Sequence, residues 1–191
     1  MAIELVIVGV GALGSHVALF VRNLDVKLTV IDFDRVEAKN TASQFHTRLS
    51  LGKNKAAALA QSLKGLFGVD ATAVPHRLGS DNVEVLLGRA GLVVDCLDDA
   101  PSRKVVQDFV RARAIPCVHG ALAADGAFGR VVWDDAFTID AAAPGAATCE
   151  DGQHLPFVAR VAAELAQAVA TYVRTGDSVG AQIFPSGQIA L

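Results

Sequence analysis

The sequence has no run of basic residues and no long apolar run. Lysine and arginine total 17 against 20 aspartate and glutamate residues, which gives a net charge of -3 and no positive surface of the kind that nucleic acid or an anionic membrane attracts. The longest apolar stretches, such as Leu5 to Val10, are far shorter than the ~20 residues that a bilayer span needs. We therefore expect neither a nucleic-acid partner nor a membrane partner.

Paired cysteines are also missing. Cys96, Cys117 and Cys149 are far apart and form no C-x-x-C motif, so the sequence predicts no zinc knuckle and no disulfide redox centre. No two histidines have the spacing of metal ligands either, and no protein-bound zinc is predicted. From Met1 the sequence passes directly into an apolar run without a secretion signal, from which we expect a cytoplasmic protein with reduced thiols.

Through the first two thirds of the chain, buried-strand patterns alternate with helical patterns. The expected strands are 3–8, 27–31, 71–74, 92–96 and 116–119, and the expected helices are 14–24, 53–66 and 102–113. Strands that alternate with helices predict a parallel, doubly wound sheet. We expect residues 1–122 to form a Rossmann-like core.

The pattern changes after residue 122. Asp125-Gly126 predicts a tight turn before a strand at 129–133, which would return antiparallel. Residues 140–148 are predicted to form a mobile loop, 156–174 a long helix closed by Gly176, and 179–184 with 188–191 a terminal hairpin. The predicted fold is one α/β domain over residues 1–191. Its three layers hold a mostly parallel sheet with antiparallel C-terminal strands.

A glycine-rich turn lies between the first strand and the first helix. It reads Gly9-Val10-Gly11-Ala12-Leu13-Gly14, and such a turn lets backbone N–H groups and a helix N-terminus receive a phosphate. Glycine at a tight strand-to-helix turn is also explained by sterics alone. Asp32 ends the second strand about 20 residues later, where a carboxylate accepts bonds from ribose hydroxyls. An NAD-dependent dehydrogenase fits these features equally well.

The stretch from Asp32 to Gln44 distinguishes the alternatives. It reads D-F-D-R-V-E-A-K-N-T-A-S-Q and is followed by G-K-N-K at 52–55. This stretch resembles the ThiF/MoeB/ubiquitin-activating family, whose pattern is D-x-D-x-V-(E/S)-x-x-N-L-x-R-Q and then G-x-x-K. The resemblance continues at 94–103, in the hairpin around 119–131 and in the long helix, so it covers roughly residues 1–176.

The resemblance implies a reaction and its participants. ATP and the C-terminal carboxylate of a small ubiquitin-like or sulfur-carrier protein ending in Gly-Gly would give an acyl-adenylate and pyrophosphate, with Mg²⁺ as cofactor. The family usually forms dimers, so a homodimer or a heterodimer is expected. The resemblance does not identify the carrier.

The resemblance also assigns roles to residues. Asp98 would hold Mg²⁺, Asp32 would bind the ribose, and Lys55 would contact phosphates, with Asp98 and Lys55 as the catalytic pair. The remaining implied nucleotide-binding residues are Gly9, Gly11, Ala12, Leu13, Gly14, Asp34, Asn40 and Gln44. Local alternatives remain, because Asp98-Asp99 would serve equally as a cap for the next helix and Lys55 as a solvated residue of a first helical turn.

The sequence departs from the family at several points. Ser43 stands where the family has a phosphate-binding arginine, and from the start at Met1 we expect no counterpart of the family's N-terminal segment, which lends an arginine to the neighbouring subunit. Three cations near Ser43 are candidate replacements or ordinary surface charges: Lys39, Arg48 and Lys53. A partner chain is another source of the charge. Cys149 is a candidate for a covalent adduct with the activated carrier, although a single cysteine is more often inert.

Three functions therefore remain open. The first is an ATP- and Mg²⁺-dependent adenylyltransferase. The second is a non-catalytic or partner-dependent nucleotide-binding subunit of the same family, which Ser43 favours. The third is an NAD(P)-binding oxidoreductase, which the stretch after Asp32 disfavours.

Overall fold

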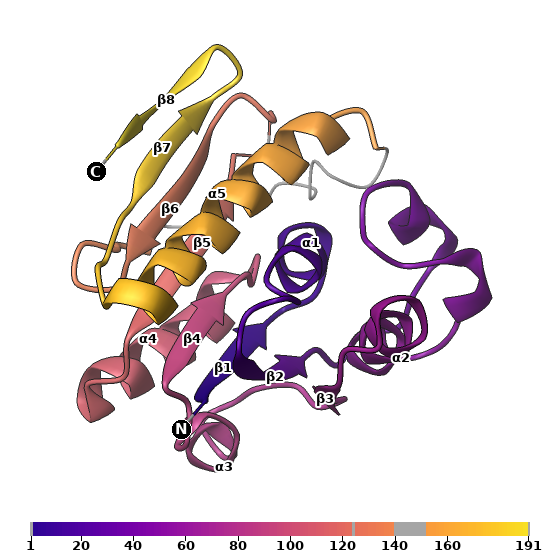
Figure 1. Cartoon of the computed structure of the whole chain (residues 1–191), viewed down its shortest axis with the longest axis horizontal. Coiled ribbons are helices and arrows are strands. Elements are labelled where there is room, and N and C mark those ends of the chain that lie inside the picture. Colours follow the sequence, from indigo (N-terminus) through magenta and orange to yellow (C-terminus); the bar gives the residue numbers. More distant parts are fainter. Residues whose placement is uncertain (1, 124, 140–151, 191) are drawn as a thin grey trace.

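A computed structural model describes residues 2–123, 125–139 and 152–190. Eight strands form one mixed sheet in the order β3-β2-β1-β4-β5-β6-β7-β8, with helices on both faces (Figure 1). The strands are β1 (Ile3–Val8), β2 (Val26–Ile31), β3 (Ala71–Val74), β4 (Leu92–Asp95), β5 (Cys117–Leu122), β6 (Gly129–Trp133), β7 (Ala181–Phe184) and β8 (Gly187–Ala190). The helices are α1 (Ala12–Phe20), α2 (Lys55–Phe67), α3 (Val83–Leu87), α4 (Ala100–Arg113) and α5 (Leu155–Thr175), with 3-10 turns η1 (Ala38–Ala42) and η2 (Arg48–Ser50).

The sheet changes direction after β5. The strands β3, β2, β1, β4 and β5 are parallel, whereas β6, β7 and β8 add to them in antiparallel pairs. The turn between β5 and β6 contains Gly126 with a φ of 66°. This confirms the predicted fold class, including the antiparallel return at Asp125-Gly126 and the terminal hairpin.

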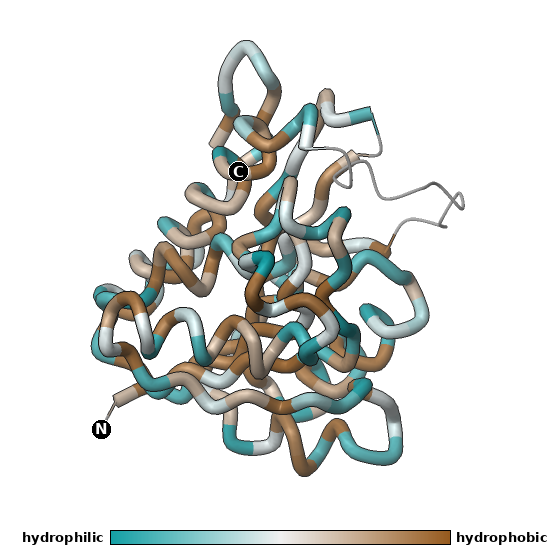
Figure 2. The backbone as a smooth tube through the Cα atoms, turned by 90° about the vertical axis from the view of Figure 1, so that its right-hand side faces the viewer, coloured by the Kyte–Doolittle hydropathy of each residue, from teal (hydrophilic) through white to brown (hydrophobic). Residues whose placement is uncertain are grey.

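Each face of the sheet has its own core. Leu5 and Ile7 of β1 point into the core covered by α1, α2 and α5, whereas Val6 and Val8 point into the core covered by α3 and α4. Burial on both faces explains why β1 is a continuous apolar run rather than an alternating one. Figure 2 shows apolar segments running through the middle of the molecule, with hydrophilic segments in many of the surface loops.

Helix α5 spans the junction between the parallel and antiparallel strands. It packs on α1, β5 and β6, and its stripe of Val158, Val161, Leu165 and Val169 is almost fully buried. Gly176 ends it in the left-handed conformation, as the sequence predicts. None of the described helices has both the length and the apolar character needed to cross a bilayer.

Some elements differ from the prediction. Helix α1 begins at Ala12 rather than Gly14, which places Ala12 and Leu13 in its first turn, and it ends at Phe20 rather than Leu24. The short helix α3 and the turns η1 and η2 were not predicted, because three to five residues are too few to show helical periodicity. The predicted loop at 140–148 lies outside the described residues.

Candidate functional site

The glycine turn brings three backbone segments into close contact. Gly9 has a φ of 82°, and a Cβ on it would lie 3.0 Å from the carbonyl oxygen of Cys96. A Cβ on Gly14 would lie only 1.9 Å from the carbonyl oxygen of Gly9. These two glycines are therefore required for the β1–α1 turn to pack against the loop that follows β4.

The N-terminus of α1 is open to an acceptor. Its N-cap is Gly11, which offers no side chain to cap the helix. The first N–H groups of a helix have no partner within it, so those of Ala12 and Leu13 are available to an anion at this end. The position fits the phosphate role expected for this turn.

Asp32 lies directly beside the turn, at the end of β2. Its Oδ2 accepts a bond from the Val10 amide at 2.8 Å and its Oδ1 accepts one from the Asp34 amide at 2.8 Å. Burial raises the pKa of the Asp32 carboxyl, while the two amide bonds and the Lys55 ammonium act in the opposite direction. Each oxygen keeps a second lone pair for a ligand hydroxyl.

Lys55 is held at the start of α2. Its ammonium is 3.1 Å from Oδ2 of Asp34, and its side chain is only 10% exposed. Asn54 caps α2 and also donates to the carbonyls of Asp32 and Asp34. Lys55 is a cation in the first turn of α2, where the helix dipole disfavours it, and Asp34 supplies the compensating negative charge. The structure thus brings Asp32, Asp34 and Lys55 together.

Asn40 has a structural partner of its own. It is buried, and its Oδ1 accepts a 2.8 Å bond from the Glu37 amide in a capping box at the start of η1. Gln44 lies against the turn, with its Nε2 3.8 Å from the position of a Cβ on Gly11. Contacts of Asn40 and Gln44 with a nucleotide stay predictions.

Unpartnered polar atoms gather just after η1. Within the described part of the chain, Ser43 Oγ, Gln44 Oε1 and His46 Nδ1 are buried without a hydrogen-bond partner. The other ring nitrogen of His46 is 3.0 Å from the Val10 carbonyl oxygen. Burial, together with the charges of Lys55 and His16, lowers the pKa of His46 to about 4. The segment that lacks the family's arginine is therefore buried against the glycine turn.

Asp98 and Asp99 follow β4 on the other side of the turn. Asp99 caps α4 by accepting a 2.8 Å bond from the Ser102 amide, so the capping alternative holds for Asp99. Asp98 is exposed, and among the described residues its carboxylate has no hydrogen-bond or ion-pair partner. Its loop touches Gly9 through Cys96 and Leu97. Asp32 and Asp98 thus follow the carboxyl ends of β2 and β4, which flank β1 and its glycine turn, and Lys55 begins α2 beside Asp34.

A buried network beneath this loop was not predicted. His119 Nδ1 is 2.7 Å from Asp95 Oδ2, and His119 Nε2 is 3.1 Å from Asp134 Oδ1. Arg103, only 8% exposed, donates to the carbonyls of Leu97 and Gly120. A charged residue inside an apolar strand requires a buried partner, and Asp95 at the end of L-V-V-D was the available signal.

The three cations near Ser43 differ in their pairing. Lys39 lies 3.6 Å from the Glu37 carboxylate and Lys53 donates to Gln61, whereas the Arg48 side chain is exposed and has no partner in the described part. Of the cysteines, Cys96 and Cys117 have raised pKa values because they are buried. The candidate adduct residue, Cys149, lies outside the described residues.

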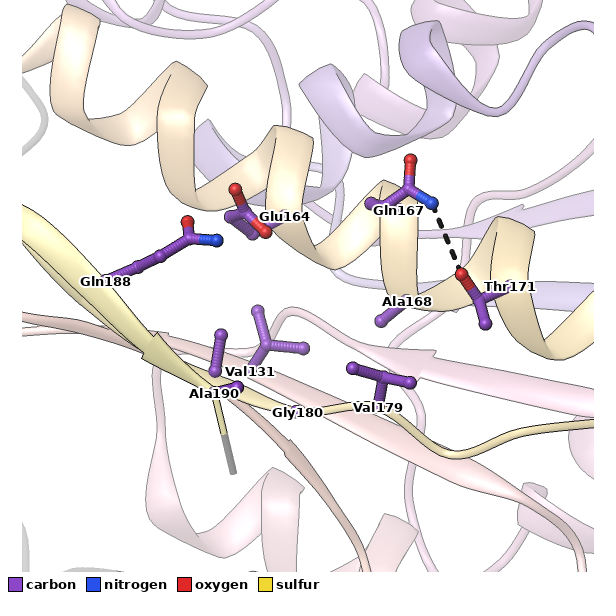
Figure 3. A pocket seen from close by; sticks show the side chains of 10 residues that line it. Val131, Glu164, Gln167, Ala168, Thr171, Val179, Gly180, Gln188 and Ala190 are labelled. Atoms are coloured by element: carbon purple, nitrogen blue, oxygen red, sulfur yellow. Dashed lines mark hydrogen bonds between the residues drawn. The ribbon is translucent and has the colours of Figure 1, made fainter.

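A pocket elsewhere does not resemble a nucleotide site. It has a volume of about 90 Å³ and lies between α5 and the strands β6 to β8 (Figure 3). Its polar side chains are Glu164, Gln167, Thr171 and Gln188, and no lysine or arginine lines it. Pockets for drug-sized ligands are several times larger, and a polyphosphate requires cations.

Comparisons with known proteins agree with this geometry. The sequence model of the ThiF family matches residues 2–174. The chain belongs to the ThiF family. It is 34% identical over 122 residues to the SAMP-activating enzyme E1 of Haloferax volcanii, which covers 62% of this chain and 45% of the relative. It is 35% identical over 122 residues to a sulfur carrier protein adenylyltransferase of Thermus thermophilus, with the same two shares.

Solved structures show the same fold in this ThiF-family chain. A crystal structure of E. coli MccB with ATP matches with a TM-score of 0.78 at 14% identity, covering 99% of this chain and 63% of that one. The chain spans less than half the length of the curated relatives named above. The family and the fold are thereby shown, and the activity of the whole protein is a matter for proposal.

Proposed function

We propose that this ThiF-family chain binds ATP at the glycine turn and activates the C-terminal carboxylate of a small carrier protein. The supporting observation is the arrangement of Asp32, Lys55 and Asp98 around the turn, at the carboxyl ends of β2 and β4 and the start of α2. Ligands of open α/β sheets bind at this edge. The relatives named as adenylyltransferases act on proteins of the same class.

The proposed reaction transfers AMP to the carrier. A carrier carboxylate oxygen attacks the α-phosphorus, the bond from that phosphorus to the bridging oxygen of the β-phosphate breaks, and pyrophosphate leaves. The N–H groups at the start of α1 bind phosphate oxygens, and Lys55 supplies positive charge. Asp32 orients the ribose through its free lone pairs.

Asp98 fits a role in holding Mg²⁺. Its carboxylate is exposed and unpaired within the described residues, and Mg²⁺ is commonly bound by one or two carboxylates together with substrate phosphates. In the described part of the chain, no three His, Cys, Asp or Glu side chains gather as a metal-binding group. The ion, when bound, would neutralise charge on the leaving pyrophosphate.

The function is tested by ATP–pyrophosphate exchange with purified candidate carriers that end in Gly-Gly. Asp98→Asn should reduce exchange by about 100-fold or more, because charge stabilisation on the leaving group is lost. Asp177→Asn, at an exposed aspartate after α5, is the matched control and should leave exchange unchanged. Equal exchange in wild type and Asp98→Asn would refute the role of Asp98.

A second function is favoured by Ser43, which is buried where the family has an arginine. In that case the chain is a nucleotide-binding subunit and a partner supplies the missing cation. Stabilisation against heat by ATP, without exchange for any carrier, would support this subunit role. Stabilisation by NAD alone would overturn both proposals.

A further inference from the structure

The backbone is fixed on both sides of Asp98, although the Asp98 side chain itself is not. Before it, Asp95 Oδ1 accepts a 2.9 Å bond from the Leu97 amide, and Arg103 Nε donates a 2.7 Å bond to the Leu97 carbonyl. After it, Asp99 caps α4 through the Ser102 amide. Both polar backbone groups of the residue preceding Asp98 are thus bound by buried side chains.

Asp95 and Arg103 are in turn fixed by neighbouring elements. Arg103 also donates a 2.6 Å bond to the Gly120 carbonyl within β5, and its Nη1 lies 3.5 Å from Asp95 Oδ2. The same Asp95 oxygen is 2.7 Å from His119 Nδ1. The position of Leu97 is therefore defined relative to β4, β5 and α4 together.

The network continues away from the loop. His119 reaches Asp134, and its ring stacks on Phe137 at 3.9 Å between centroids. Arg111 binds Asp134 from the solvent side, with its Nε 2.7 Å from Oδ2. Every ring nitrogen and carboxylate in this chain of contacts has a partner, and only Arg103 Nη1 is buried without a hydrogen bond in it. The network therefore restricts the motion of the groups that it joins.

Stability alone does not account for such a network. A buried ion pair contributes little net stability compared with apolar residues of the same volume, because both charges lose their hydration. What Arg103 provides that an apolar residue does not is a rigid fork of donors aimed at two carbonyls beside the glycine turn.

We infer that Asp95 and Arg103 are positioning residues, which hold the loop of residues 96–99 so that the Asp98 carboxylate faces a nucleotide bound at the glycine turn. The nucleotide part of this inference rests on the proposed function. The rigidity of the loop does not, and the two parts are measured separately.

The matched variants are Arg103→Met and Arg111→Met. Both arginines lie on α4, and each binds one aspartate and two backbone carbonyls. The two carbonyls that Arg111 binds belong to Asp134 and Phe137, which are far along the chain from Asp98. Arg103→Lys keeps a charge near Asp95 and loses the fork. It provides a folded variant if Arg103→Met proves unstable.

The first measurement is hydrogen exchange of the ligand-free protein. In Arg103→Met the Leu97 amide should exchange about 10-fold faster than in wild type. The reason is that the free energy of opening the loop falls by about the contribution of one hydrogen bond. Arg103→Lys should show a smaller increase, and Arg111→Met should leave this amide unchanged. Equal exchange of Leu97 in wild type, Arg103→Met and Arg103→Lys overturns the positioning role.

The second measurement is calorimetric titration with ATP, with excess Mg²⁺ or with a chelator. Arg103→Met should lose about 10-fold or more of the Mg²⁺-dependent gain in ATP affinity, as supporting residues of metal ligands commonly do, while the Mg²⁺-free affinity stays constant. Arg111→Met should keep the whole gain. Equal losses in both variants overturn the inference. If wild type binds no ATP, the proposed function fails, and hydrogen exchange still decides the positioning role.

Discussion

Two groups of buried polar side chains lie beside the glycine turn, and their hydrogen bonding differs sharply. On the β4 side, Asp95, Arg103 and His119 bind one another and the surrounding backbone, and among their buried side-chain atoms only Arg103 Nη1 lacks a hydrogen bond, although it lies 3.5 Å from Asp95 Oδ2. On the β2 side, Ser43, Gln44 and His46 each leave an atom unpartnered. Satisfied networks hold a structure rigid, whereas unsatisfied buried groups lower stability and are found more often at functional sites.

The difference suggests that the two groups of buried residues have different roles in the site. We propose that the β4 side fixes the geometry of Asp98, and that the β2 side gives up stability next to the turn that receives the nucleotide. Substitutions on the two sides should then have opposite consequences. The predictions below test this contrast from the largest effect to the smallest.

Asp95→Ala should have the largest effect on stability. The substitution leaves the buried Arg103 and His119 without their carboxylate, and breaking a buried pair in this way costs about 3–5 kcal/mol. Urea denaturation measures the loss. The control is Asp108→Ala, which removes an exposed partner of Lys104 and should cost no more than about 0.5 kcal/mol. Similar losses in both variants would remove the contrast between network and surface.

His46 should make the fold sensitive to acid. The pKa of His46 is lowered from 6.5 to about 4, so the unfolded chain takes up a proton more readily than the folded one. The resulting stability is complete above pH 6.5 and is lost as the pH falls to 4, by about 3 kcal/mol. Urea denaturation at pH 7 and pH 4 measures it.

The matched variant is His46→Gln, whose amide still donates to the Val10 carbonyl but does not titrate. Its stability should fall less between pH 7 and pH 4 than that of wild type. Asp32 has a raised pKa and acts in the opposite direction, but it contributes to both proteins and largely cancels in the comparison. The same pH dependence in both proteins would contradict the assignment to His46.

Ser43→Ala should have the smallest effect. The Ser43 hydroxyl is buried and has no partner among the described residues, so its removal should change stability by less than about 1 kcal/mol, with a gain rather than a loss expected. Thermal unfolding of the two proteins without ligand provides the measurement. A loss of more than about 1 kcal/mol would mean that the hydroxyl is bonded in solution.

Much of the fold was predictable from local patterns. The apolar run at 5–8 located β1, the Ala- and Val-rich segment 71–74 located β3, and Asp125-Gly126 located the antiparallel return into β6, each with the observed bounds. The turns η1 and η2 escaped prediction because side-chain bonds and contacts distant in sequence hold them, such as the capping box at Asn40. Local pattern does not encode those contacts.

The placement of the candidate residues was partly predictable, although their roles stay predictions. Motif spacing located Gly9, Asp32 and Asp98 at the carboxyl ends of β1, β2 and β4, because parallel strands end at one edge of the sheet. Spacing did not reveal that Lys55 pairs with Asp34, nor that Asp95 lies 2.7 Å from His119. The first contact joins a loop residue to the start of a helix 21 residues later, and the second joins positions 24 residues apart that are paired by the register of β4 and β5.

The late place of α5 in the sequence has a consequence for synthesis on the ribosome. This helix covers one face of α1, β5 and β6, yet it is translated after all three. Until its residues emerge, the growing chain carries an uncovered apolar face that includes Val131 and Val118. We therefore expect a nascent chain halted before residue 155 to recruit chaperones or to aggregate, and folding to finish only after α5 has docked.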